Sequence, residues 1–137
     1  MIPPIPIGNP PITQAWFGIW YEPLHDEPDP TMLEIVRSRG LRPWKTVPPR
    51  ADIDPLALAD EWIQALPLET KVYILVPGTA FDRFGARHGR GVGWYDRFLA
   101  QIPRTWLRVG VTLQKNLHEA PLVCRPWDER MDWLIVA

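Results

Sequence analysis

The sequence predicts an α/β fold, a three-layer sandwich built on a mainly parallel sheet. Strand-like and helix-like segments alternate along the chain, and the run "VYILV" at residues 72 to 76 is apolar without interruption. A continuously apolar strand is typical of a parallel sheet that is covered on both faces. The length of 137 residues is common for a single domain, so we expect one core.

The first half of the chain supplies two strand and helix pairs. Residues 15 to 21, "AWFGIWY", are short, aromatic and β-branched, as expected for a strand. A helix follows, begun either by Asp29 with Pro30 or by a capping box of Thr31 with Glu34, and ended by Gly40. Its apolar stripe comprises Met32, Leu33, Ile35 and Val36. Residues 41 to 47 predict a second strand, and residues 54 to 66 a second helix that starts at another Asp-Pro pair.

The second half begins with the apolar strand at residues 72 to 76, which Pro77 and Gly78 end. A long loop is expected next, then a helix from about Gly93 to Pro103. The segments "WLRVGVTL" and "DWLIVA" predict two further strands. In such a sheet, ligands bind beyond the carboxyl ends of the strands, which is where the loop after residue 76 would lie.

Composition restricts the classes of partner. Fifteen basic and sixteen acidic side chains give a net charge of −1, so no overall field draws the chain to nucleic acid or to a membrane. The single cysteine, Cys124, excludes an internal disulfide, and the first residues lack the pattern of a signal peptide. We therefore expect a cytoplasmic protein that binds a small molecule.

Proline is unusually frequent, at 17 of 137 residues. It is concentrated in residues 1 to 14, which predict an extended arm ahead of a single domain at residues 15 to 137. Such an arm can lie over its own core or over a neighbouring subunit, and in the second case it would support a homo-oligomer.

The segment "HGRGVGWYDRF", residues 88 to 98, carries the chemistry. Gly89, Gly91 and Gly93 allow the backbone to turn its N–H groups toward an anion, and the helix that begins near Gly93 adds the positive end of its dipole. Trp94 stands where the dinucleotide fingerprint needs glycine. Four arginines make this segment locally positive: Arg83, Arg87, Arg90 and Arg97. A solvated surface turn is the alternative interpretation.

Together with the strand before it, "LVPGTAFDRFGARHGRGVGWYDRFL" resembles the 5-formyltetrahydrofolate cyclo-ligase family, whose strand ends in a VPG-AFD-type run before a G-R-LG-G-GGYYDR-type loop. The segments "VGVTLQKNL" and "PWDERMDWLIVA" are similar to that family's closing segments. The resemblance implies a cyclo-ligase-like sandwich of the NagB/RpiA/CoA-transferase-like type. It also implies the use of ATP and Mg²⁺ to convert 5-formyltetrahydrofolate into 5,10-methenyltetrahydrofolate.

The resemblance also implies roles for individual residues. Phosphate or nucleotide would bind at Gly89, Arg90, Gly91, Val92, Gly93 and Trp94. Tyr95, Asp96, Arg87 and His88 would be catalytic, with Tyr95 facing the formyl group or the phosphate. Glu27 would contact substrate, and Asp96 and Glu27 would hold Mg²⁺, which prefers oxygen ligands.

The sequence departs from the family at several positions. No basic residue precedes Arg37, the stretch between residues 47 and 71 is short, and Val92 and Trp94 replace more usual residues. Three hypotheses follow. The chain is a minimal cyclo-ligase, with missing cations supplied by Arg50, Lys45, Lys71 or a partner subunit. Alternatively, it is a shortened paralogue that acts on another small molecule, by cyclisation, dehydration or deformylation and without ATP, or a non-catalytic binding and assembly protein.

Histidine and cysteine predict little further chemistry. His25, His88 and His118 are scattered without metal-ligand spacing, and Cys124 has no neighbour in sequence that would activate a thiol. His88 is the exception, because it precedes the glycine loop, where an imidazole can serve as an acid or a base. A hydrogen bond from its ring to the backbone would instead give it a structural role.

Overall fold

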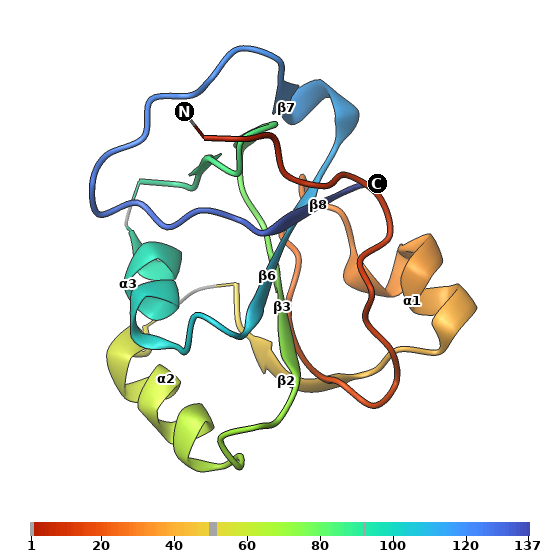
Figure 1. The fold of residues 1–137 in the computed structure, drawn as a ribbon, viewed down its shortest axis with the longest axis vertical. Coiled ribbons are helices and arrows are strands. Elements are labelled where there is room, and N and C mark those ends of the chain that lie inside the picture. The colour runs from red at the N-terminus through yellow and green to blue at the C-terminus, as the bar shows by residue number, and fades with distance from the viewer. Residues whose placement is uncertain (1, 50–51, 92) are drawn as a thin grey trace.

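The computed structural model describes residues 2–49, 52–91 and 93–137 as a three-layer α/β sandwich, which confirms the expected fold class. Five strands form a parallel sheet in the order β2-β1-β3-β6-β8. They comprise β1 (Phe17–Tyr21), β2 (Pro43–Val47), β3 (Val72–Val76), β6 (Leu107–Thr112) and β8 (Trp133–Val136). Figure 1 shows α1 (Glu34–Arg39) on one side of this sheet and α2 (Pro55–Gln64) and α3 (Trp94–Gln101) on the other.

The position of β3 at the centre of the sheet explains why its sequence is apolar without interruption. All five of its residues are buried, and alternate side chains enter different cores. Val72, Ile74 and Val76 pack in the core beneath α2 and α3. Tyr73 and Leu75 pack in the core beneath α1. A strand covered on both faces has no position where a polar side chain reaches water.

Both predicted Asp-Pro caps form, but only Asp54 caps an α-helix, because α1 begins after Leu33 without a side-chain cap. Asp54 accepts a hydrogen bond from the Leu56 N–H at 3.0 Å, and α2 starts at the next residue. In the segment before α1, Asp29 caps a 3₁₀ turn and accepts from the Thr31 N–H at 3.0 Å, so the alternative capping box of Thr31 with Glu34 is wrong. The segment is also divided: a 3₁₀ turn, η1 (Pro30–Met32), precedes α1.

Two expectations about local structure are corrected. Met32 was expected in the apolar stripe but is 65% exposed, because it ends the 3₁₀ turn before α1 begins. The loop after β3 contains two short strands, β4 (Ala80–Asp82) and β5 (Arg87–His88). They pair antiparallel with each other, while β4 pairs parallel with β7 (Leu117–His118), which follows a second 3₁₀ turn, η2 (Gln114–Asn116). These strands form a second, three-stranded sheet.

The proline-rich arm contacts its own chain along the edge of the sheet. Leu134 of β8 donates its N–H to Pro6, and its carbonyl accepts from the Gly8 N–H at 2.9 Å. Further along, Arg39 donates to the carbonyls of Pro10 and Ile12. Figure 1 shows the arm, drawn in red, passing over β8 and then alongside α1. Across the described parts of the chain, no helix is long and apolar enough to cross a membrane.

Candidate functional site

A cavity of about 860 Å³ opens at the carboxyl ends of β1, β2 and β3, where Tyr21, Val47 and Pro77 lie in its wall. This is the edge at which parallel sheets bind ligands, and the volume is within the range for small-molecule sites. The cavity brings together ten of the eleven residues singled out as a site: Glu27, Arg87, His88, Gly89, Arg90, Gly91, Gly93, Trp94, Tyr95 and Asp96. Val92 lies outside the described residues.

The glycine loop requires its glycines for backbone reasons. Gly91 has φ +90° and Gly93 has φ +67°, angles that residues with a Cβ adopt only with strain. A Cβ added at either residue would meet nothing within 4 Å, so space is not the constraint. Gly93 is also the N-cap of α3, and the cap has no side-chain hydrogen bond, so the first N–H groups of the helix lie next to the cavity.

Arg87 is buried and bonded to the backbone. Its Nε donates to the carbonyl of Pro77, and its guanidinium carbon lies 5.0 Å from the centre of the Tyr95 ring. Burial lowers the pKa of Arg87, and the neighbouring Tyr95 and Asp96 oppose this shift. Arg87 therefore joins the end of β3 to the first turn of α3.

Tyr95 and Asp96 both lie in the first turn of α3, but their side chains contact different neighbours. Burial raises the pKa of Tyr95, and the nearby Glu27 carboxylate raises it further, while Arg87 opposes both. The phenol is thus neutral at pH 7 and can donate a hydrogen bond. Asp96 accepts a hydrogen bond from the backbone N–H of Glu129 at 3.1 Å, which ties the helix to the C-terminal segment.

Arg90 pairs with two carboxylates of the segment that follows β1. Its guanidinium lies 2.6 Å from Asp26 and 3.5 Å from Glu27. The hydrogen bond with Asp26 raises the pKa of Arg90 and lowers the pKa of Asp26. Glu27 is more enclosed, with its side chain 8% exposed, and it also accepts from the Leu24 N–H at 2.9 Å. The sequence indicated Glu27 and Arg90 but not their pairing, which joins residues 63 positions apart.

Two other predicted residues bond to backbone. The His88 ring lies on the cavity wall, and its Nε2 donates to the carbonyl of Val123 at 2.8 Å, which gives it the structural role considered above. The Trp94 indole donates to the carbonyl of Ile53 at 2.9 Å and stacks on Phe98, with ring centres 5.2 Å apart. The side chain of Trp94 thus belongs to the core as well as to the cavity wall.

Two of the cations expected from elsewhere in the chain, Lys45 and Lys71, lie away from the cavity. Lys71 precedes β3, at the end of the strand opposite to the cavity, and its Nζ lies 5.5 Å from the Trp16 ring. Lys45 lies within β2, over the Trp44 ring at 5.3 Å. Neither lysine lines the cavity, and Arg50 lies outside the described residues. The structure instead places Arg97 and Arg125 in the cavity wall.

The donor set fits a hard divalent cation. Asp96, Glu27 and Asp128 all line the cavity, although the described residues contain no group of three or more His, Cys, Asp or Glu able to hold a metal by themselves. Mg²⁺ is usually bound by one or two carboxylates together with phosphate oxygens, so one or two of these acids beside the glycine loop are sufficient. Cys124 is less suited to metal or nucleophilic chemistry, because burial raises the pKa of its thiol.

The fold and the site together define an α/β protein with a glycine loop and a cavity at the carboxyl edge of its parallel sheet. The sequence model of the 5-formyltetrahydrofolate cyclo-ligase family matches residues 30–137, so the chain belongs to this family.

Individual relatives are distant. A 5-formyltetrahydrofolate cyclo-ligase from Mycoplasma pneumoniae is 27% identical over 88 residues, which are 59% of this chain and 52% of that protein. One from Mycolicibacterium smegmatis is 41% identical over 56 residues, 41% of this chain and 29% of that protein. The chain thus spans about half the length of the first of these curated relatives and less of the second. The solved structure of a 5,10-methenyltetrahydrofolate synthetase from Mycoplasma pneumoniae has the same fold, with a TM-score of 0.56 and 21% identity over 88% of this chain and 73% of that one.

Proposed function

We propose that the chain is an ATP- and Mg²⁺-dependent 5-formyltetrahydrofolate cyclo-ligase. One observation carries the proposal: the segment that resembles the family loop turns at Gly91 and Gly93, which have positive φ, and these glycines share one cavity with Glu27, Tyr95 and Asp96. The membership in the family and the names of the two relatives support the choice of substrate. In this reaction the formyl oxygen of the folate takes the γ-phosphoryl group of ATP, the neighbouring amine attacks the activated carbon, and phosphate leaves.

The residues of the cavity fit the demands of phosphoryl transfer, which are positioning and neutralisation of charge. The N–H groups of the glycine loop and of the start of α3 would hold phosphate oxygens. The neutral phenol of Tyr95 would donate a hydrogen bond to the formyl oxygen or to the phosphoryl group that it receives. Arg87, buried against Pro77 and Tyr95, would keep that phenol in place.

Asp96, with Glu27 or Asp128, would hold Mg²⁺, which neutralises phosphate charge and orients the phosphates when it is bound. For Glu27, this role requires the weak contact with Arg90 at 3.5 Å to give way. Arg90 has Asp26 as its closer carboxylate, so release of Glu27 leaves one ion pair intact.

The proposal is tested by incubating the protein with 5-formyltetrahydrofolate and Mg·ATP while recording the methenyl absorbance and ADP together. Both should rise in equal amounts. Asp96→Ala should lower kcat/KM by about 10²-fold or more, because a carboxylate beside the phosphates is lost. Glu61→Ala, which removes an exposed carboxylate from the outer face of α2, should leave the rate unchanged. Failure of the wild-type protein to bind Mg·ATP in calorimetry would refute the proposal.

A second candidate is a paralogue that converts another small molecule without ATP. Two observations favour it: Arg90 is paired with Asp26 and Glu27, and Lys45 and Lys71 do not line the cavity. Both reduce the positive charge that a triphosphate could contact. Product formation in the absence of ATP, together with a bound metabolite identified by mass spectrometry, would support this function over the first.

A further inference from the structure

The arginines around the glycine loop are not equally available to an anion. Arg87 is committed to the carbonyl of Pro77 and to the face of Tyr95. Arg90 is committed to Asp26 and Glu27. Among the described residues, Arg97 and Arg125 line the cavity without an ion pair. Of these two, Arg125 lies in the segment between β7 and β8, far in sequence from the glycine loop.

The segment 119–129 is fastened to the site at three places, which fixes where Arg125 lies. Its Leu122 N–H donates to the buried carboxylate of Asp82 at 2.8 Å. Its Val123 carbonyl accepts from His88, immediately before the glycine loop. Its Glu129 N–H donates to Asp96 in the first turn of α3. Arg125 therefore lies on a short stretch that is held at both ends beside the glycine loop.

Trp127 is the neighbour of Arg125 in this stretch and differs from the other tryptophans. It is 66% exposed, whereas the seven others are buried or half-buried. The guanidinium carbon of Arg125 lies 5.7 Å from the centre of its ring, and both side chains line the cavity. An exposed indole that holds a guanidinium by a cation–π contact presents a flat surface and a positive charge side by side.

We propose that Arg125 and Trp127 form the nucleotide clamp of this chain, with Arg125 binding the phosphates and Trp127 stacking on the base. The inference rests on the proposed function, because that function supplies ATP as the ligand. The segment that carries both residues is held by His88 and Asp96, which lie on either side of the glycine loop, and this position favours the nucleotide over the folate. Arg125 thereby supplies the positive charge that Lys45 and Lys71 are placed too far away to give.

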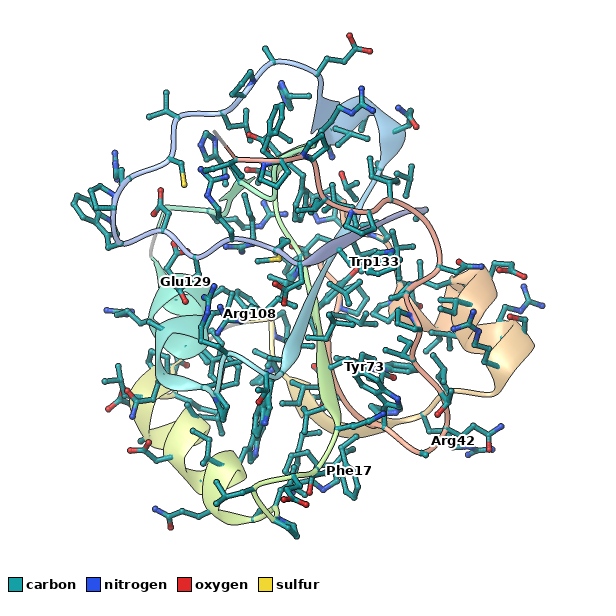
Figure 2. All side chains as sticks on the ribbon, viewed as in Figure 1. Phe17, Arg42, Tyr73, Arg108, Glu129 and Trp133 are labelled. Atoms are coloured by element: carbon teal, nitrogen blue, oxygen red, sulfur yellow. The ribbon has the colours of Figure 1, made fainter. Side chains whose placement is uncertain are left out.

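The experiment measures the dissociation constants of Mg·ATP and of tripolyphosphate, which has no base, by calorimetry at two salt concentrations. Arg125→Ala should weaken both ligands about tenfold and reduce the salt dependence, because one charge-assisted contact is lost. Trp127→Ala should weaken ATP about fivefold and leave tripolyphosphate unchanged. Arg42→Ala is the matched control, since Arg42 is exposed, immediately precedes β2 and does not line the cavity. Figure 2 shows its side chain at the periphery of the molecule. Thermal unfolding should give all three variants the melting temperature of the wild type.

The outcomes separate the two proposals. If ATP binds and both substitutions act as stated but no methenyl product forms, the clamp stands and the cyclo-ligase function fails. If methenyl product forms at the wild-type rate and ATP affinity in Arg125→Ala equals that in Arg42→Ala, the function stands and the clamp is wrong. A rise in the KM for 5-formyltetrahydrofolate with unchanged ATP affinity would overturn the clamp as well, by placing both residues on the folate side.

Discussion

At the scale of single residues, the site depends on backbone angles as much as on side chains. Gly93 is both the left-handed cap of α3 and part of the cavity wall, so one residue sets the direction of the helix and of the N–H groups at its start. Gly89 differs, because its φ is not in the positive region and an added Cβ would instead lie 3.0 Å from the Arg87 guanidinium.

Gly93→Ala should lower the free energy of unfolding by about 1–2 kcal/mol, since a Cβ is strained at φ +67° although it meets no neighbour. Denaturant unfolding measures this change. The substitution should also weaken tripolyphosphate, because the loop relaxes away from the strained angle. Gly8→Ala, at φ +137° in the open arm, is the control for strain and should leave anion binding intact. Unchanged stability in Gly93→Ala would show that the loop does not need this angle.

At the scale of elements, a buried ion pair joins α3 and β6 to the segment that reaches Asp96. Arg108 of β6 has a side chain that is 1% exposed, and it donates to the Glu129 carboxylate at 3.1 Å and to the Leu99 carbonyl of α3 at 2.7 Å. The Glu129 N–H in turn donates to Asp96. Figure 2 shows Arg108 and Glu129 side by side next to α3. Burial lowers the pKa of Arg108, so Glu129 is needed to offset the cost of the enclosed charge.

Glu129→Ala should therefore destabilise the protein by about 3–5 kcal/mol, because it leaves the guanidinium of Arg108 buried without its carboxylate. The double variant Arg108→Met with Glu129→Leu should recover much of this loss, since it removes both charges. A double-mutant cycle from urea unfolding gives the coupling energy between the two residues. Additive effects of the single substitutions would contradict a coupled pair.

Elements were predictable from the sequence where a local pattern determines them. The helix from Asp54 and the strand at residues 72 to 76 follow from a cap, a periodicity and an apolar run. The strands β4 and β5 were missed, because each is only two or three residues long and pairs through tertiary contacts.

The candidate site was predictable at the glycine loop, because the spacing of its glycines is also a local pattern. The places of Arg125 and Trp127 in the cavity wall, and of Asp26 as the partner of Arg90, were missed, because segments far apart in sequence bring these residues together.

At the scale of the whole molecule, the three tyrosines of the chain share one property, a phenol whose pKa is raised by burial. Burial raises the pKa of Tyr21, Tyr73 and Tyr95 above the ordinary value of 10.0. A raised folded-state pKa gives stability that is present below pH 10 and is lost as the pH rises, because the unfolded chain then releases protons that the folded protein keeps.

Above about pH 10, the free energy of unfolding should fall by up to about 1.4 kcal/mol per pH unit for each tyrosine. Urea unfolding between pH 8 and pH 11 measures the slope. Tyr95→Phe should reduce it by about one third, because one of the three groups is removed. Tyrosinate absorbance should appear only together with unfolding. A reversible titration near pH 10 in the folded protein would contradict the prediction.

The arm along β8 has a consequence for association. Both edges of a parallel sheet expose N–H and carbonyl groups that can pair with another chain. At β8, the backbone N–H and carbonyl of Leu134 already form hydrogen bonds with Pro6 and Gly8, so the arm of the same chain pairs with this edge. At β2, the edge carries Pro43 and Lys45, a missing donor and a charge, which discourage a further strand. The N-terminal residues thus block the addition of a further strand at β8, and the proline and the lysine disfavour it at β2. Aggregation by strand addition at β8 would have to begin with detachment of the arm.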